Sequence, residues 1–287
     1  MSYIRFGLMI LTSTVVMFIL MYLNTYAWEH VFFSETRAYM ALVMGATMAV
    51  IMLAYMLGMY SNRSLNIAIF AGSVIVFALS LWLVRSQVTV SGPSYMRAMI
   101  PHHSIAVMTS ERAQIRDPRV RKLADEIIAA QRREIAEMRY LIADVSAGNV
   151  VENIYRDPPA EPGSIQDALD NTLISTLDPA PMPAAEAEQV LTASQVCRFN
   201  RSPETDPVLW ASADGNMAAM KLNGVLVSLD GGSRAEDGAR RFETEGAAVR
   251  VAPLTEDEAD WRQNAELVFS LEQGLEAGYR GFWRCSG

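Results

Sequence analysis

Three long stretches without a charged residue occupy the first third of the chain, and they constrain its fold more than any other feature. They run from Phe6 to Trp28, from Ala38 to Asn62 and from Ser64 to Val84. As a helix, each stretch is long enough to cross a hydrocarbon core of about 30 Å. The sequence therefore predicts three transmembrane helices within residues 1–85.

The first of these stretches also raises the alternative of a cleaved signal peptide. Its apolar run far exceeds the usual length of about 7–15 residues, and no clear small-x-small cleavage site follows it. We expect it to stay as an anchor. Arginines flank both ends of the predicted helices, Arg5 and Arg63 on one side, Arg37 and Arg85 on the other. This balance leaves the orientation undecided.

The two cysteines decide the orientation of the predicted membrane helices. Cys197 and Cys285 are the only cysteines in the chain, and a disulfide between them would persist only in an oxidising compartment. The alternative is two unpaired buried thiols. With the disulfide, we expect a multi-pass protein of the bacterial inner membrane, with a cytoplasmic N-terminus and residues 85–287 in the periplasm.

Charge is segregated along the chain. Residues 1–147 contain 13 Lys and Arg against 9 Asp and Glu, a net charge of +4, whereas residues 148–287 contain 11 against 23, a net charge of −12. An acidic distal half argues against nucleic acid and against anionic lipid headgroups as its partner. Another envelope protein remains a possible partner of this acidic part.

A pair of helices is predicted after the membrane region, in residues 94–147. Ser94 can cap the first helix, which continues to about Gln114, and Asp117 before Pro118 is a strong signal for the start of the second. If the first helix begins near Ser94, Pro101 lies in its interior and kinks it. If the helix begins at residue 101, the proline is simply its first residue.

The rest of the chain is predicted to contain no further long helix. Residues 148–196 are rich in Pro, Ala, Asp and Glu, which is typical of a linker. Within residues 197–287, three segments have β-type composition and are separated by turn signals: Val208–Ser212, Ala218–Leu229 and Ala247–Pro253. We expect a small, mainly β domain closed by one disulfide, in a chain that is mainly α overall.

Imidazole and thioether side chains gather at the start of the helical pair. On a helical wheel, one sector of the first helix holds four of them: Met96, Met99, His102 and His103. Sulfur and imidazole ligands favour copper, particularly Cu(I), over magnesium or calcium. On the second helix, Gln131 and Glu134 interrupt an apolar stripe that also contains Met138, and buried polar groups of this kind need a partner.

Two interpretations of these residues stay open. They can form a metal site with Met96, Met99, His102, His103, Glu134 and Met138 as ligands. Alternatively, the histidines and the polar groups opposite form a buried hydrogen-bonded cluster that fixes helix register. The distal domain contains no histidine, which removes the usual serine or cysteine catalytic arrangements, so no enzyme is expected.

The run Met99–Met108, together with Asp117–Arg121 and Gln131–Met138, resembles the bacterial domain-of-unknown-function 305 family over residues 94–145. The resemblance implies a ferritin-like helical fold and copper binding at Met99, His102, His103 and Met138. The motif occurs once here, and a four-helix bundle would need a second copy, so a homodimer is expected.

A second resemblance concerns the end of the chain. The segment Gly278–Cys285 resembles small periplasmic β-barrel inhibitors of lysozyme. Together, these observations predict a membrane-anchored, extracytoplasmic protein that binds copper for sequestration, sensing or delivery. The alternative function is a non-catalytic structural or protein-interaction module of the cell envelope.

Overall fold

The chain forms two compact units in its computed structural model. The structure describes residues 2–159, 162, 170–193, 195–232, 235 and 237–286. The first unit is Met1–Ile127 and the second is Ile128–Gly287, so the boundary falls inside a long helix.

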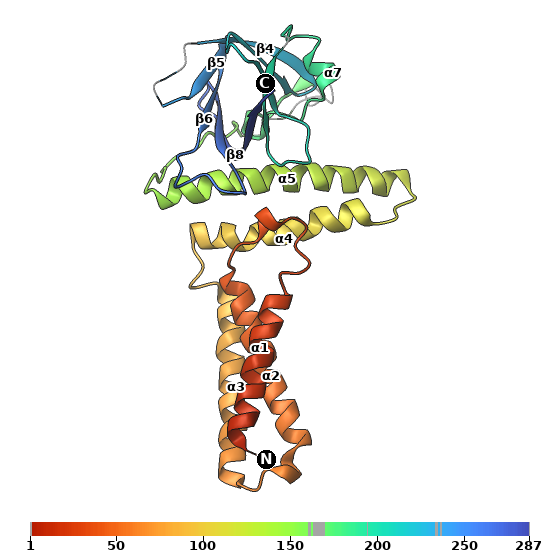
Figure 1. The fold of residues 1–287 in the computed structure, drawn as a ribbon, viewed down its shortest axis with the longest axis vertical. Helices are drawn as coiled ribbons and strands as arrows, with labels where there is room; N and C mark the ends of the chain where they lie inside the picture. Colours follow the sequence, from red (N-terminus) through yellow and green to blue (C-terminus); the bar gives the residue numbers. More distant parts are fainter. Residues whose placement is uncertain are drawn as a thin grey trace. The chain divides into compact units, whose positions relative to one another are not determined.

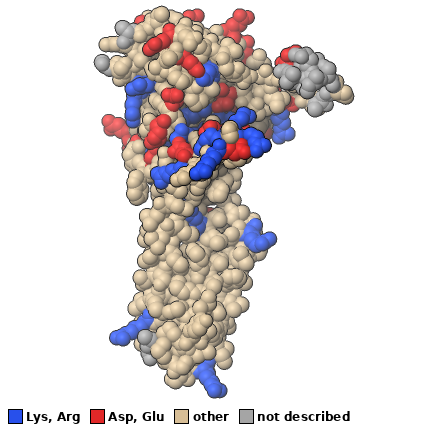
Figure 2. Space-filling view, turned by 90° about the vertical axis from the view of Figure 1, so that its right-hand side faces the viewer, with Lys and Arg blue, Asp and Glu red and all other residues tan. Residues whose placement is uncertain are grey.

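Three apolar helices make up most of the first unit. They are α1 (Tyr3–Leu20), α2 (Glu35–Tyr55) and α3 (Arg63–Ser86), and they run alongside one another (Figure 1). Each is long and apolar enough to cross a membrane, as predicted. On the face shown in Figure 2, the bundle is uncharged along most of its length, and its basic side chains lie towards its ends.

Small residues allow α1 and α2 to approach each other closely. Ala41, Gly45 and Ala49 of α2 are buried. A Cβ atom at Gly45 would lie only 2.3 Å from Oγ1 of Thr14 in α1, so this contact requires glycine. The methionines spaced four residues apart along α2 and at its C-cap are at least partly exposed: Met40, Met44, Met48, Met52 and Met56.

Two polar helices follow the bundle. The helix α4 (Gly92–Arg112) contains Pro101 in its interior, so it begins before the proline. The helix α5 (Pro118–Ser146) begins where the sequence predicted, because Asp117 accepts a hydrogen bond from the backbone N–H of Arg119 at 2.9 Å. Two short 3-10 helices, η1 (Trp28–His30) and η2 (Leu57–Met59), lie in the loops of the bundle.

The second unit contains a closed antiparallel barrel in which each strand pairs with its neighbours in sequence and the last pairs with the first. Its eight strands are β1 (Val196–Asn200), β2 (Leu209–Ser212), β3 (Met217–Leu222), β4 (Val225–Gly231), β5 (Arg240–Thr244), β6 (Ala247–Pro253), β7 (Ala265–Leu271) and β8 (Glu276–Cys285). Asn223 and Gly224 both have positive φ, as the tight turn between β3 and β4 requires.

Alternate residues of the strands fill the barrel with a single apolar core. Its largest fully buried side chains are Phe199, Leu209, Met220, Leu229, Phe242, Leu267, Phe269 and Tyr279. A second apolar cluster lies around Trp210 of β2 and includes Met182 and Leu191. These two residues come from the segment that contains η3 (Ile174–Thr176) and α7 (Ala184–Ala187), which packs against the barrel there. The Trp210 Nε1–H donates to the Met182 carbonyl at 2.9 Å.

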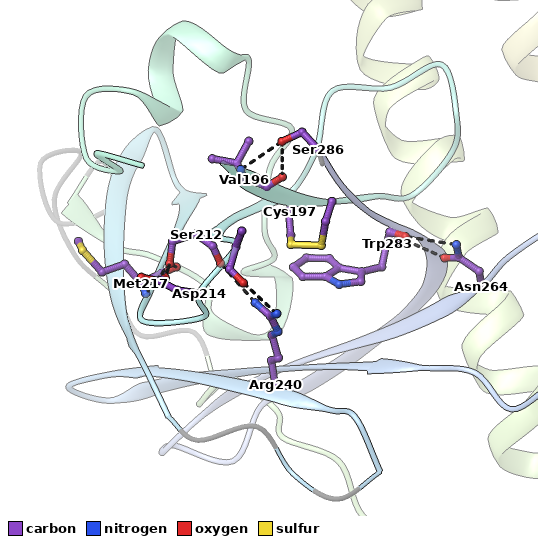
Figure 3. Close-up of a disulfide and its surroundings, with 11 residues drawn as sticks. Val196, Cys197, Ser212, Asp214, Met217, Arg240, Asn264, Trp283 and Ser286 are labelled. Atoms are coloured by element: carbon purple, nitrogen blue, oxygen red, sulfur yellow. Dashed lines mark hydrogen bonds between the residues drawn. A yellow bond between two sulfur atoms is a disulfide. The ribbon is translucent and has the colours of Figure 1, made fainter. Parts of the chain in front are cut away.

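The predicted disulfide is confirmed. Cys197 of β1 and Cys285 of β8 are directly opposite each other and are bonded, so the disulfide closes the barrel where its last strand meets its first (Figure 3). The Trp283 indole lies beside the disulfide in the same view. The bond therefore fixes the register of the β1–β8 pair covalently.

The expected fold class is wrong. A mainly α chain with a ferritin-like hairpin and a small, mainly β domain was predicted, but the C-terminal half holds a closed eight-stranded barrel. The prediction missed β1, β5, β7 and β8. Each of these strands contains at least one charged residue and β1 pairs with the distant β8, so no long apolar run marks them in the sequence.

Candidate functional site

Helix α4 is attached to the bundle of three apolar helices in the first unit, and it runs across the end of this bundle in Figure 1. Its buried Ser104 accepts a hydrogen bond from the backbone N–H of Tyr26 at 3.0 Å. The Ser104 Oγ is also 2.9 Å from Nδ1 of His30, which is buried in η1. All three histidines of the chain therefore lie on α4 or against it.

The His103 ring is held in one orientation by its own helix. Its Nδ1 lies 2.9 Å from the backbone carbonyl oxygen of Met99, one turn earlier. A carbonyl oxygen only accepts, so Nδ1 carries the proton, and the lone pair of the neutral ring is on Nε2. Metal-binding histidines are commonly oriented in this way, through a hydrogen bond from the nitrogen that does not bind the metal.

The exposed His102 ring is next to that of His103. The two ring centroids are 6.1 Å apart, and the planes meet at 68°. Two imidazoles that bind one ion through bonds of about 2.0–2.1 Å have centroids about 5–6 Å apart. The separation of 6.1 Å between the His102 and His103 rings lies just above this range.

Thioethers complete the set of donors on α4. Met96 is buried and Met99 is half-buried, and they are one helical turn apart. Within the described ranges, no group of three or more His, Cys, Asp and Glu side chains could hold a metal ion. A metal site on α4 therefore depends on methionine sulfur, and sulfur with imidazole is the donor set of a soft ion.

The other two predicted ligands, Glu134 and Met138, lie on α5 in the second unit. One Glu134 carboxylate oxygen accepts from Gln131 at 3.5 Å, and the other is 3.9 Å from an Arg133 nitrogen. Met138 is buried. The predicted ligands are thus divided between the units, four on α4 and two on α5.

A partly buried charge network in the second unit, centred on the buried Arg201, was not predicted from the sequence. Arg201, after β1, donates to a carboxylate oxygen of Asp178 at 2.9 Å and to the Pro179 carbonyl at 2.8 Å. Its guanidinium lies 4.1 Å from the ring centroid of Tyr279, a residue whose pKa is raised to about 12 by burial. From α5, Arg133 reaches the same Asp178 at 3.5 Å.

This network attaches α5 to the barrel through a second helical face. Ala136 belongs to the barrel core, and Tyr140 touches Gly278 of β8. Burial raises the pKa of the Glu137 carboxyl on this face; Arg133 and Arg201 oppose the rise. A sequence signal exists in retrospect, because residues 133, 136, 137 and 140 recur at the spacing of one helical face.

Residues 142–287, just over half of the chain, match the model of a domain of unknown function, DUF6692. The chain belongs to the DUF6692 family. One curated relative, Uncharacterized protein L153 of Acanthamoeba polyphaga mimivirus, is 30% identical over 115 residues, which cover 39% of this chain and 74% of that protein. No solved structure matches the chain significantly.

Membership of DUF6692 corrects the family expected from the sequence. The resemblance to the domain-of-unknown-function 305 family was wrong, and with it the ferritin-like fold that it implied. That resemblance depended on residues 94–145, and the DUF6692 match begins only at residue 142. A pair of histidines on one amphipathic helix and a Gln-x-x-Glu spacing on the next are short patterns that unrelated helices can share.

Proposed function

We propose that this protein is a membrane-anchored metal-binding protein whose helix α4 holds a soft metal ion, copper as Cu(I). The proposed ligands on α4 are Met96, Met99, His102 and His103. They would sequester the ion, sense it or pass it on, without a chemical reaction. The proposal depends on these side chains and not on a family resemblance.

The hydrogen bond between His103 and the Met99 carbonyl supports this proposal most strongly. It gives one imidazole a fixed orientation and a defined lone pair, which reduces the conformational entropy lost on metal binding. A thioether, from Met96 or Met99, is a weak ligand for hard ions, so the set favours Cu(I) over Mg(II) or Zn(II).

The proposed location is the outer side of a bacterial inner membrane. Disulfides persist in oxidising compartments, so the Cys197–Cys285 bond supports a periplasmic position for residues 85–287. The N-terminus of α1 would then be cytoplasmic. In this arrangement α4 would meet metal ions from the periplasm.

A competition titration tests the metal proposal. The full chain in detergent is titrated with Cu(I) under anaerobic conditions against a chromophoric Cu(I) chelator, and then with Zn(II) and Mg(II). We expect the strongest retention for Cu(I). The variant His102→Ala/His103→Ala should weaken Cu(I) binding by at least about tenfold, because it removes both imidazole ligands.

Matched methionine variants provide the control. Met96→Leu/Met99→Leu should weaken Cu(I) binding, whereas Met108→Leu should leave it unchanged because residue 108 lies on the opposite side of the helix from Met99. Equal copper retention by the wild type and the double histidine variant would show that the site is not on α4.

A second candidate function belongs to the barrel. The segment Gly278–Cys285, which resembles lysozyme inhibitors, forms most of β8, and β8 closes the barrel. A net charge of −12 in residues 148–287 favours a basic protein partner. We would measure lysozyme activity on bacterial cell walls with the protein added: slower clearing is expected, and unchanged clearing at molar excess would contradict this function.

A further inference from the structure

Two arginines lie directly opposite each other where the barrel closes. Arg198 of β1 pairs with Arg284 of β8, in the position next to the disulfide pair Cys197–Cys285. Both arginine side chains are exposed on the outer surface. Like charges directly opposite on neighbouring strands destabilise a sheet, and here a covalent bond one residue away holds them in that register.

Neither guanidinium has a hydrogen bond or an ion pair with another residue in the described part of the chain. The Arg284 guanidinium lies 5.5 Å from the ring centroid of Phe282. The contrast with the other basic side chains of this domain is clear, since six have a carboxylate partner: Arg201, Lys221, Arg241, Arg250, Arg262 and Arg280.

This isolation is not caused by a shortage of acidic residues. Residues 148–287 contain 23 Asp and Glu against 11 Lys and Arg, so carboxylates outnumber basic side chains about two to one. A local arrangement that lowers stability without a compensating contact in the protein is characteristic of a functional site.

The two arginines line a pocket of about 330 Å³ on the barrel surface. Its other walls come from the β1–β2 loop, from Trp210 and from Ala184 of α7. The loop is held in place by its own hydrogen bonds, including one from the Asn200 side-chain amide to the Thr205 carbonyl at 2.7 Å. The pocket therefore has fixed walls and two cationic groups at one side.

We propose that this pocket is an anion-binding site for a small molecule that carries a phosphate monoester. A phosphate monoester has a charge of about −1.5 to −2 near neutral pH and three acceptor oxygens. Two guanidinium groups offer it planar pairs of N–H donors and neutralise that charge. A carboxylate would need only one of the two arginines.

The exposed carboxylate of Asp206 also lies on the pocket wall. Its removal tests the proposal, because the sign of the change in phosphate affinity can be predicted. Its negative charge opposes an anion, so Asp206→Asn should tighten phosphate binding. Weaker phosphate binding by Asp206→Asn would contradict a site in which the anion lies beside this carboxylate.

Calorimetric titration of the full chain in detergent at low salt tests the site, with inorganic phosphate and glycerol 3-phosphate as probes and acetate as the control anion. We expect both phosphates to bind and acetate to bind at least about tenfold more weakly. Arg198→Gln and Arg284→Gln should each weaken phosphate binding by about tenfold or more, because each removes charge-assisted hydrogen bonds.

Arg241→Gln is the matched control, since Arg241 is an exposed strand arginine that already has a partner, Glu243. Its phosphate affinity should equal that of the wild type. Equal losses in Arg241→Gln and Arg198→Gln would show that only the net charge of the barrel matters, and would overturn the proposal. Acetate binding as strong as that of phosphate would overturn the choice of ligand.

Discussion

Gly278 of β8 lies against Tyr140 of α5. A Cβ atom added there would be 2.4 Å from Cε1 of Tyr140, so Gly278→Ala should force the ring to move. Overpacking of this kind lowers stability by about 1–3 kcal/mol. We expect a lower denaturation midpoint, measured by tryptophan fluorescence of the full chain in detergent.

A double-mutant cycle separates this contact from a general effect of alanine in β8. In the Tyr140→Ala background the added methyl group has room, so Gly278→Ala should destabilise the barrel much less there than in the wild type. The same loss of stability in both backgrounds would show that the contact with Tyr140 is not the cause.

Glu137 should make the stability of the second unit depend on pH. Burial raises the pKa of its carboxyl above the usual 4.5, with Asp178 and Glu134 adding to the rise and Arg133 and Arg201 opposing it. Between pH 4.5 and this raised pKa the folded state binds more protons than the unfolded state, so stability falls as pH rises through that window.

The variant Glu137→Gln removes this titration. We expect its denaturation midpoint to change less with pH than that of the wild type, with the advantage of the variant growing from pH 4.5 upwards and then levelling. Parallel pH profiles of the two proteins would show that Glu137 titrates normally.

The relative placement of single residues could be predicted from the sequence where all of them lie on one helix. The periodicity of a helix is enough to place Met96, Met99, His102 and His103 in one sector. The arginine pair was not predicted, because its register depends on the closure of the barrel. A signal was present in the sequence: in an antiparallel disulfide pair, the residue after Cys197 faces the residue before Cys285, and both are arginine.

At the scale of elements, the helices were predictable and half of the strands were not. Uncharged runs marked α1, α2 and α3, and the Asp117–Pro118 signal marked the start of α5. A strand such as β1, with five residues, is too short for periodicity to show and gains its stability from partners distant in sequence. Composition alone could not show that these strands close into a barrel.

Helix α5 illustrates a second limit of prediction from sequence. Its apolar stripe, with Ile135, Met138 and Ile142, was recognised, but the face that packs on the barrel contains Arg133, Ala136, Glu137 and Tyr140. A face with so many polar residues looks solvent-exposed by pattern. It is half-buried against the barrel, where Arg133 pairs with Asp178 and Glu137 interacts with Arg201, two partners that lie far along the chain. The homodimer, which was expected because the helical pair occurs only once in the chain, stays a prediction.

At the scale of the whole molecule, the chain combines a bundle that can cross a membrane with a disulfide-closed barrel. The two proposed sites are on different units: thioethers and imidazoles on α4 would hold a soft cation, and paired arginines on the barrel would hold a phosphate. They would bind ions of opposite charge, and they share no residue. Loss of one activity in a site variant should therefore leave the other intact.

X-ray absorption spectroscopy of the Cu(I)-loaded full chain tests the metal site most directly, because it reports the atoms bound to copper. We predict both imidazole nitrogen and thioether sulfur in the first coordination shell, loss of the nitrogen signal in His102→Ala/His103→Ala, and loss of the sulfur signal in Met96→Leu/Met99→Leu. A shell of oxygen and nitrogen without sulfur, unchanged in both variants, would contradict a soft-metal site on α4.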